Sequence, residues 1–174
     1  MIVSNGSAVY RAEDGVRVYG STLSTDTIDR ILSLPFHEEM TFEVQIQGES
    51  YTEQRYIDDP ARFGATGFGV SYIRKTRHGV ADLRVFAEEH KTEIDEMIFV
   101  SARKEQRVSF HEALLNFVPD IRITSSVPNL IEVGHVDADK GKTLGRFMQM
   151  NGIAMDEAMA FGDAGNDISM LTAV

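Results

Sequence analysis

The sequence predicts an α/β protein, and two observations support this fold class. Through the middle of the chain, strand-like stretches alternate with helix-like apolar patterns and hairpin turns, which is typical of an α+β sandwich. Near the C-terminal end, the apolar run Ala158–Phe161 stops at Gly162-Asp163, and a helix-like apolar run follows. This order predicts a buried strand, a tight acidic loop and the start of a helix, because glycine allows the sharp turn.

The first elements predict a β-hairpin. Residues Val3 to Arg11 have the composition of a strand, and Val16 to Tyr19 are expected to form the strand that returns. Between them, Asp14-Gly15 is a dipeptide that favours a tight hairpin turn. We therefore expect these two strands to pair antiparallel.

A helix is expected over Asp26 to Leu34, because its apolar residues recur at helical spacing on one face. Ser24 or Thr25 precedes the helix as a candidate N-cap, since either hydroxyl can accept a hydrogen bond from a free backbone N–H. Pro35 ends the helix, because proline cannot continue it.

The remaining elements follow from the same two periodicities. Met40 to Gln47 alternates between apolar and polar side chains, which is the period of a half-buried strand. Asp58 to Gly69 is rich in glycine and predicts a loop. The other expected strands are Tyr51–Tyr56, Val70–Ile73, Glu96–Val100, Ile121–Ser126 and Leu130–Val133. The other expected helices are Ala81–His90, Val108–Phe117 and Thr143–Met150.

The acidic loop near the C-terminal end is the strongest functional signal. Asp163 and Asp167 are four residues apart, so both can face one point beyond the carboxyl end of the preceding strand. Open α/β sheets bind their ligands at this position. Paired carboxylates with the amide of Asn166 between them suit Mg²⁺, which prefers oxygen ligands and keeps places for water and phosphate.

Three segments together resemble the haloacid dehalogenase-like (HAD) phosphohydrolases. Gly162–Asp167 resembles the family's fourth motif, GDxxND, and Val136–Leu144 resembles the stretch that carries the lysine of its third motif. Ile2–Tyr10 resembles the segment that precedes the cap domain in the Cof-type subgroup. The three occur in the family's order and at about its spacing, and this combination is more specific than any one motif.

The resemblance implies a partial Rossmann-like core with an inserted α+β cap. The expected division is residues 1–22 and 128–174 for the partial core and residues 23–127 for the cap. It also implies a Mg²⁺-dependent phosphatase for small phosphorylated metabolites such as sugar phosphates, with an aspartyl-phosphate intermediate and a cap that closes over the substrate.

The resemblance assigns a role to five residues. Lys140 is expected to contact the nucleophile and the substrate phosphate, and Asp163 to bind Mg²⁺. Asn166 and Asn5 are expected on the substrate side. Asp167 is the second acidic member, either at the metal, one layer outside it, or holding the loop and the lysine.

Each of these residues also has a structural interpretation. Lys140 can be a solvated lysine at a helix start. Asp163, Asn166 and Asp167 can cap the helix that follows them. Asn5, followed by Gly6, can belong to an ordinary Asn-Gly turn.

Two family motifs do not occur in the sequence. DxDGT, which carries the nucleophilic aspartate and the acid/base aspartate, is absent, and so is the Thr or Ser motif. We therefore expect the chain to be a slice of a longer phosphatase that is inactive alone. The alternative is a non-catalytic binding or regulatory module built from a cap and a partial core. Sheet edges left exposed are expected to favour a homo-oligomer.

Composition narrows the remaining classes of function. The 174 residues carry a formal net charge of −10, which disfavours nucleic acid or an anionic membrane as partner. No apolar run approaches the length of a membrane span. The chain has no cysteine, which is compatible with a cytoplasmic protein and excludes disulfides and thiolate metal sites.

Overall fold

The computed structural model describes residues 1–174 and contains two β-sheets. The strands are β1 (Ile2–Val3), β2 (Ala8–Tyr10), β3 (Arg17–Gly20), β4 (Thr41–Ile46), β5 (Glu49–Glu53), β6 (Arg77–Val80), β7 (Glu96–Val100), β8 (Ile121–Thr124) and β9 (Leu130–His135). The smaller sheet has the order β1-β2-β3 and is antiparallel. The larger sheet has the order β6-β5-β4-β7-β9-β8, and only its β5–β6 pair is parallel.

Short and medium helices connect these strands. The α-helices are α1 (Thr25–Ser33), α2 (Gln54–Asp58), α3 (Phe68–Thr76), α4 (Leu83–Glu89), α5 (Lys104–Phe117), α6 (Lys140–Met150) and α7 (Ile168–Leu171). The 3₁₀ turns are η1 (Ser4–Gly6), η2 (Pro60–Phe63), η3 (Met155–Glu157) and η4 (Gly165–Asp167). None of the helices combines the length and the hydrophobicity needed to cross a membrane. The mixed α/β class expected from the sequence is confirmed.

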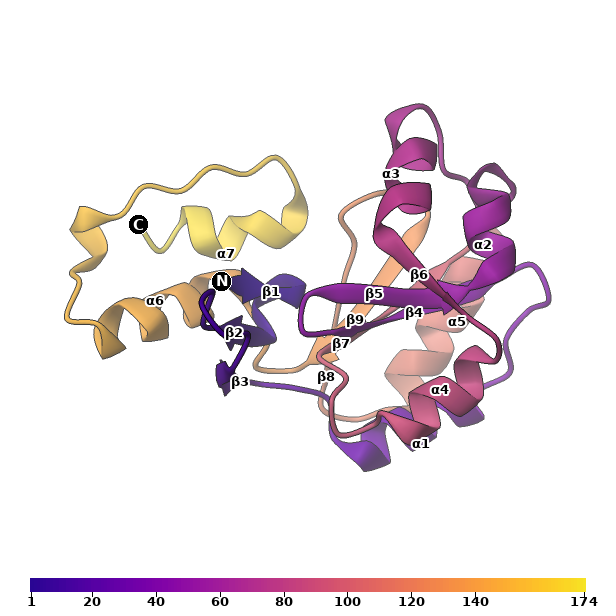
Figure 1. The fold of residues 1–174 in the computed structure, drawn as a ribbon, viewed down its shortest axis with the longest axis horizontal. Coiled ribbons are helices and arrows are strands. Elements are labelled where there is room, and N and C mark those ends of the chain that lie inside the picture. The colour runs from indigo at the N-terminus through magenta and orange to yellow at the C-terminus, as the bar shows by residue number, and fades with distance from the viewer.

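One face of the larger sheet forms the main hydrophobic core. Helices α1, α4 and α5 lie along this face (Figure 1). Ile28 of α1, Leu83 of α4 and Leu114 of α5 pack against Val44 and Phe99 of the sheet, and all five side chains are buried. Removing this much apolar surface from water is the dominant stabilising contribution in such a sandwich.

The opposite face of the larger sheet is unusually polar. Helices α2 and α3 and the turn η2 cover one end of it, where Tyr56, Phe63 and Ile73 form a second small cluster. Glu43 and Glu96 are buried farther along the same face. Met40 to Gln47 was expected to form a half-buried strand, but all six residues of β4 are buried because both faces of the sheet are covered.

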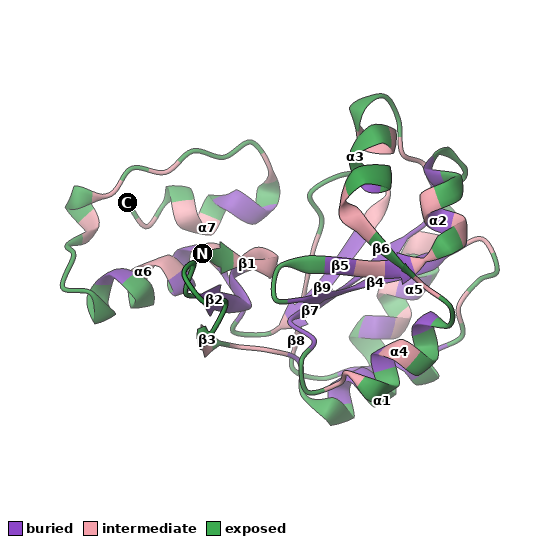
Figure 2. Ribbon diagram, in the orientation of Figure 1, coloured by how far each residue is buried: buried purple, intermediate pink, exposed green.

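The smaller sheet, α6 and α7 form a second region that contains both chain termini (Figure 1). This region is more exposed than the larger sheet (Figure 2). Asp95, which is fully buried, joins the two regions: it accepts hydrogen bonds from Tyr10 Oη at 2.7 Å and from Arg17 Nη1 at 3.1 Å. Burial and the hydrogen bond to Asp95 raise the pKa of Tyr10 to about 12.

Two expectations for the strands are wrong. Val3 to Arg11 is not one strand, because Ser4, Asn5 and Gly6 all have positive φ and turn the chain between β1 and β2. The Val70–Ile73 segment lies in α3 rather than in a strand. There it presents Ile73 to Tyr56 and Phe63, so tertiary packing decided its conformation.

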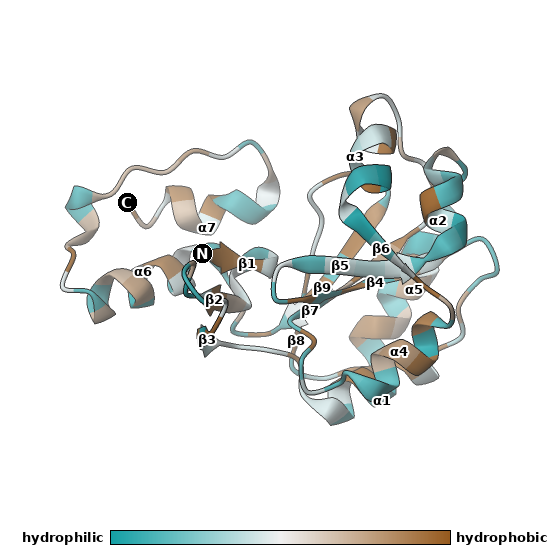
Figure 3. Cartoon of the chain, viewed as in Figure 1, coloured by the Kyte–Doolittle hydropathy of each residue, from teal (hydrophilic) through white to brown (hydrophobic).

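A third expectation is also wrong, and it concerns the segment before the acidic loop. Ala158–Phe161 forms no strand, and the side chains of Met159 and Phe161 are each 80% exposed. The loop between α6 and α7 is exposed in Figure 2 yet hydrophobic over much of its length in Figure 3. No strand of the chain lies beside this segment to pair with it.

Several local expectations are confirmed. Ser24 caps α1 and accepts from the Thr27 N–H at 3.1 Å. Strand β7 has the expected bounds, and the hairpin of β2 and β3 forms around Asp14-Gly15. Strand β9 pairs with β7 and β8, so the larger sheet continues past residue 128, the expected start of the second core segment.

Candidate functional site

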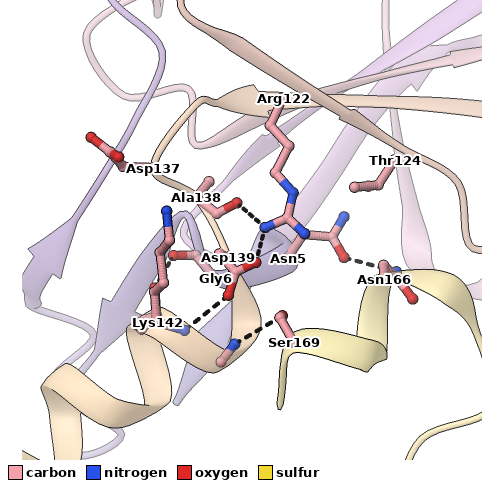
Figure 4. A network of polar contacts seen from close by, with 12 residues as sticks. Asn5, Gly6, Arg122, Thr124, Asp137, Ala138, Asp139, Lys142, Asn166 and Ser169 are labelled. Atoms are coloured by element: carbon pink, nitrogen blue, oxygen red, sulfur yellow. Dashed lines mark hydrogen bonds and ion pairs between the residues drawn. The ribbon is translucent and has the colours of Figure 1, made fainter. Parts of the chain in front are cut away.

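Three segments far apart in the sequence meet beside the smaller sheet: η1, the first turn of α6, and the loop that leads through η4 into α7 (Figure 4). Gly6 permits the closest approach, because a Cβ at this position would lie 2.6 Å from the backbone of Asp139. Thr143 Oγ1 donates to the Gly6 carbonyl oxygen at 2.7 Å. The N-terminus of α6 is therefore held against η1.

Asp167 connects the lysine of α6 to the acidic loop. Lys140 Nζ donates to Asp167 Oδ1 at 2.6 Å, and Asp167 Oδ2 accepts from the backbone N–H groups of Asp163 and Ala164, both at 3.1 Å. The hydrogen bond from Lys140 lowers the pKa of Asp167 below its usual value. Gly162 leaves room for this arrangement, since a Cβ there would collide with the Asp167 side chain.

Asn5 connects the acidic loop to the larger sheet. Its Oδ1 accepts from Asn166 Nδ2 at 2.9 Å. Its Nδ2 donates to Glu96 Oε1 at 2.6 Å and to Glu132 Oε2 at 3.1 Å. Asn5 has the left-handed backbone conformation (φ 54°), which asparagine tolerates better than most residues.

Asp139 fixes the start of α6 (Figure 4). It caps the helix by accepting from the Lys142 N–H at 2.9 Å, and it forms an ion pair with Arg122 of β8. Burial raises the pKa of Asp139, but hydrogen bonds from Lys142 N–H, Ser169 and Arg122 outweigh this effect and leave the pKa below its usual value. Because Asp139 immediately precedes Lys140, these contacts also orient the lysine. Lys142 itself is exposed.

The Asp163 carboxylate is exposed and makes no hydrogen bond or ion pair within the chain. Asn166 Oδ1 is buried and has no partner in the chain. No group of three or more His, Cys, Asp or Glu side chains forms a metal cage. An exposed, unpartnered carboxylate nevertheless fits Mg²⁺, which commonly binds through one or two carboxylates and completes its shell with water and phosphate.

The structure brings together all five residues singled out from the sequence. It adds Glu96, Glu132 and Arg122, which sequence reasoning missed. One signal was available: Glu96 and Glu132 are acidic residues in mostly apolar strands. A buried carboxylate requires a partner, so such a residue indicates a polar contact across that face of the sheet.

The chain is similar in structure to several known HAD proteins. A haloacid dehalogenase-like hydrolase from B. subtilis matches with a TM-score of 0.72 and 21% identity, over 99% of this chain and 65% of that one. The HAD subclass IIB sugar phosphatase BT4131 matches with a TM-score of 0.65 and 20% identity, over 98% and 59%. The HAD phosphatase BT1666 from Bacteroides thetaiotaomicron matches with a TM-score of 0.66 and 17% identity, over 97% and 57%.

These identities establish a shared fold, and this chain spans about three-fifths of the length of the structures it resembles, between 57% and 65%. A comparison with curated proteins gives no match. The sequence model of the haloacid dehalogenase-like hydrolases matches residues 1–174, which is the whole chain. The chain belongs to the haloacid dehalogenase-like hydrolase family.

Proposed function

We propose that this chain is part of a Mg²⁺-dependent phosphatase that hydrolyses small phosphorylated metabolites, such as sugar phosphates, through an aspartyl-phosphate. The contact between Lys140 and Asp167 carries this proposal, because it places an ammonium group and the acidic loop at one point. One of the structurally similar proteins is a HAD subclass IIB sugar phosphatase, and this supports the proposed substrate class. We keep a cytoplasmic location as part of the proposal, since the chain has no cysteine.

Lys140 and Asn166 would bind the phosphate of the substrate. An ammonium group offers compact positive charge and three donors, which offset the charge of a phosphate and of an attacking carboxylate. The Asn166 side-chain NH₂ carries two hydrogens, and Asn5 accepts one of them. The other remains for a phosphate oxygen.

Asp163 would hold Mg²⁺, with Asp167 as the second acidic member of the site. When bound, the metal would neutralise negative charge on the phosphoryl group and on the attacking carboxylate. Both Asp167 oxygens already have partners within the chain. We therefore give Asp163 the direct metal contact and Asp167 the task of holding the loop and the lysine.

The nucleophile is the part of the proposal that this sequence does not supply. The sequence contains no DxDGT motif. Of the two carboxylates among the five site residues, Asp167 is paired with Lys140, so only Asp163 has no partner in the chain. We therefore propose that the attacking aspartate belongs to the remainder of a longer protein. The same missing motif favours the alternative, a non-catalytic module.

Metal and phosphate binding by this chain test the proposal directly. We expect Mg²⁺ to shift the backbone amide resonances of Gly162–Asp167, and inorganic phosphate to shift those near Lys140 and Asn166. Asp163→Asn should abolish the response to Mg²⁺. The matched control is Asp156→Asn, which changes an exposed aspartate of η3 outside the site and should respond like the unchanged chain.

Turnover tests where the nucleophile lies, and ligand binding distinguishes the two functions. We expect no phosphate release by this chain from sugar phosphates or an aryl phosphate, with or without Mg²⁺. Mg²⁺-dependent release that Asp163→Ala abolishes would contradict the assignment of the nucleophile to another segment. Absence of both Mg²⁺ and phosphate binding would contradict the phosphatase proposal and favour the non-catalytic module.

A further inference from the structure

The amide of Asn5 is fully occupied within the chain. Its Oδ1 accepts from Asn166 Nδ2 at 2.9 Å, and its Nδ2 donates to Glu96 at 2.6 Å and to Glu132 at 3.1 Å. An Asn amide has two N–H hydrogens, so both are used in these contacts. Asn5 therefore has no remaining donor for a substrate, which differs from the substrate-side role expected for it.

The partners of Asn5 lie in different parts of the fold. Asn166 belongs to the acidic loop, whereas Glu96 and Glu132 lie on neighbouring strands of the larger sheet, β7 and β9. Each of these three side chains is less than 10% exposed. Hydrogen bonds that are shielded from water are electrostatically stronger than exposed ones.

Glu132 is held by other groups as well. Its Oε2 also accepts from Thr124 Oγ1 at 3.0 Å, and its Oε1 accepts from Ser126 Oγ. Glu96, in contrast, accepts a side-chain hydrogen bond from Asn5 alone. Of the two contacts that Asn5 makes with the carboxylates, the one with Glu96 is therefore the variable one, because Thr124 and Ser126 also hold Glu132.

We propose that Asn5 is a positioning residue that transmits the position of the larger sheet to the Gly162–Asp167 loop. The paired carboxylates Glu96 and Glu132 hold one end of its amide, and the other end orients Asn166. When the sheet and the loop approach, Asn166 is turned so that its second N–H and its Oδ1 face the site. When they separate, Asn166 loses this orientation. The consequence for phosphate binding rests on the proposed function, but the coupling itself does not.

The charges around Glu96 make this coupling depend on protonation. Burial, helped by the neighbouring charges of Glu132 and Asp95, raises the pKa of Glu96 to about 8, against the lowering effects of the Asn5 hydrogen bond and of Lys140. Asp167 neutralises Lys140, and Arg17 faces Asp95. If the sheet moves away, water reaches Glu96 and its pKa returns toward the usual value of 4.5. Burial of Glu96 therefore favours its protonated form, whereas the hydrogen bond from Asn5 favours its ionised form.

Nuclear magnetic resonance of this chain tests the coupling without any turnover or metal. In the unchanged chain, we expect the Asn166 side-chain NH₂ signals to shift with a midpoint near pH 8, although Asn166 does not contact Glu96. Glu96→Gln keeps an oxygen that accepts from Asn5 but cannot titrate. It should preserve the Asn166 signals and remove their dependence on pH. Glu49→Gln, on an exposed residue of β5, should change neither.

Asn5→Asp provides the second arm of the test. It keeps the shape and the tolerance for the left-handed conformation, but it places an acceptor where Glu96 and Glu132 need a donor. We expect the exchange protection of the Asp163 and Ala164 N–H groups to fall about tenfold or more, as for the loss of a hydrogen bond to a charged group. Protection factors correct for the intrinsic effect of pH on exchange.

Three results would overturn the proposal. One is an Asn166 signal that does not titrate in the unchanged chain, and another is a titration that persists in Glu96→Gln. The third is unchanged protection of the loop in a folded Asn5→Asp variant. Should Asn5→Asp fail to fold, the comparison of Glu96→Gln with Glu49→Gln decides alone. Loss of Mg²⁺ or phosphate binding with the coupling intact would count against the proposed function only.

Discussion

Lys140 Nζ lies 2.6 Å from Asp167 Oδ1, while Asp167 Oδ2 accepts from the N–H groups of Asp163 and Ala164. One carboxylate thus fixes both the lysine of α6 and the backbone that carries Asp163. The lysine and the proposed metal ligand are positioned by the same group, so neither can move without the other. In this chain the last aspartate of the Gly162–Asp167 loop therefore holds the loop and the lysine together.

Asp167→Asn is predicted to destabilise the chain by about 1–2 kcal/mol, because the amide cannot provide both acceptors of the carboxylate. Denaturant unfolding followed by circular dichroism measures the change. Asp163→Asn is the matched control in the same loop, and it should change stability by less than about 0.5 kcal/mol because its carboxylate is exposed and unpartnered. Equal losses in the two variants would contradict this division of roles.

Stability is predicted to fall as pH rises from about 5 to 8. Glu96 has a raised pKa of about 8 in the folded chain and a usual value of 4.5 when unfolded. The folded state then binds more protons between these values, so the free energy of unfolding decreases by up to about 1.4 kcal/mol per pH unit. Urea unfolding at several pH values measures this slope. In Glu96→Gln the slope should become shallower, while burial of Glu43 and Asp95, which raises their pKa values, maintains the remainder.

At acidic pH the stability changes with pH in the opposite direction. Asp139 and Asp167 have lowered pKa values in the folded chain, so their contributions are present above pH 3.8 and are lost as pH falls through the lowered values. We therefore expect the highest stability between about pH 4 and 5. A profile that rises steadily from pH 5 to 8 would contradict the burial of Glu96 and the sign given to it.

Local signals in the sequence predicted much of the fold. The hydroxyl of Ser24 and the Asp14-Gly15 turn act through their nearest neighbours, so their effects are visible without the rest of the chain. The strand expected at Val70–Ile73 failed for the opposite reason. Its β-branched residues favour a strand, but Ile73 packs on Tyr56 and Phe63 as part of a helix.

The candidate site could likewise be predicted only where its residues belong to local sequence patterns. Lys140, Asp163 and Asp167 lie in short motifs, so the sequence indicates them. Glu96 and Glu132 do not. A period-two pattern shows which side chains share one face of a strand, but not which groups that face contacts. Their contact with Asn5 spans 91 and 127 residues and follows from the fold alone.

The exposed segment Ala158–Phe161 is predicted to cause self-association. Met159 and Phe161 are each 80% exposed, and apolar groups this exposed favour contact with another apolar surface. Met159→Gln with Phe161→Ser should reduce association in sedimentation velocity while changing stability by less than about 0.5 kcal/mol. Phe68→Ser in α3, where the side chain is 82% exposed, is the matched control and should leave association unchanged. Reduced association in the control alone would place the contact on α3 instead.

Tyr10→Phe is predicted to lower the free energy of unfolding by about 1–3 kcal/mol, because it weakens the contact between the two regions. The variant removes the hydroxyl that donates to Asp95 at 2.7 Å and leaves a buried carboxylate short of one partner. Tyr19→Phe is the control, since its hydroxyl is only partly buried and makes contacts of 3.2 Å with Ser21 and Arg146. Denaturant unfolding should show the larger loss in Tyr10→Phe. Because the lost contact joins the regions rather than lying within either, the transition should also broaden as the smaller region unfolds first. An equal shift in both variants, with a single sharp transition, would show that Asp95 is satisfied by Arg17 and the Gln47 N–H alone.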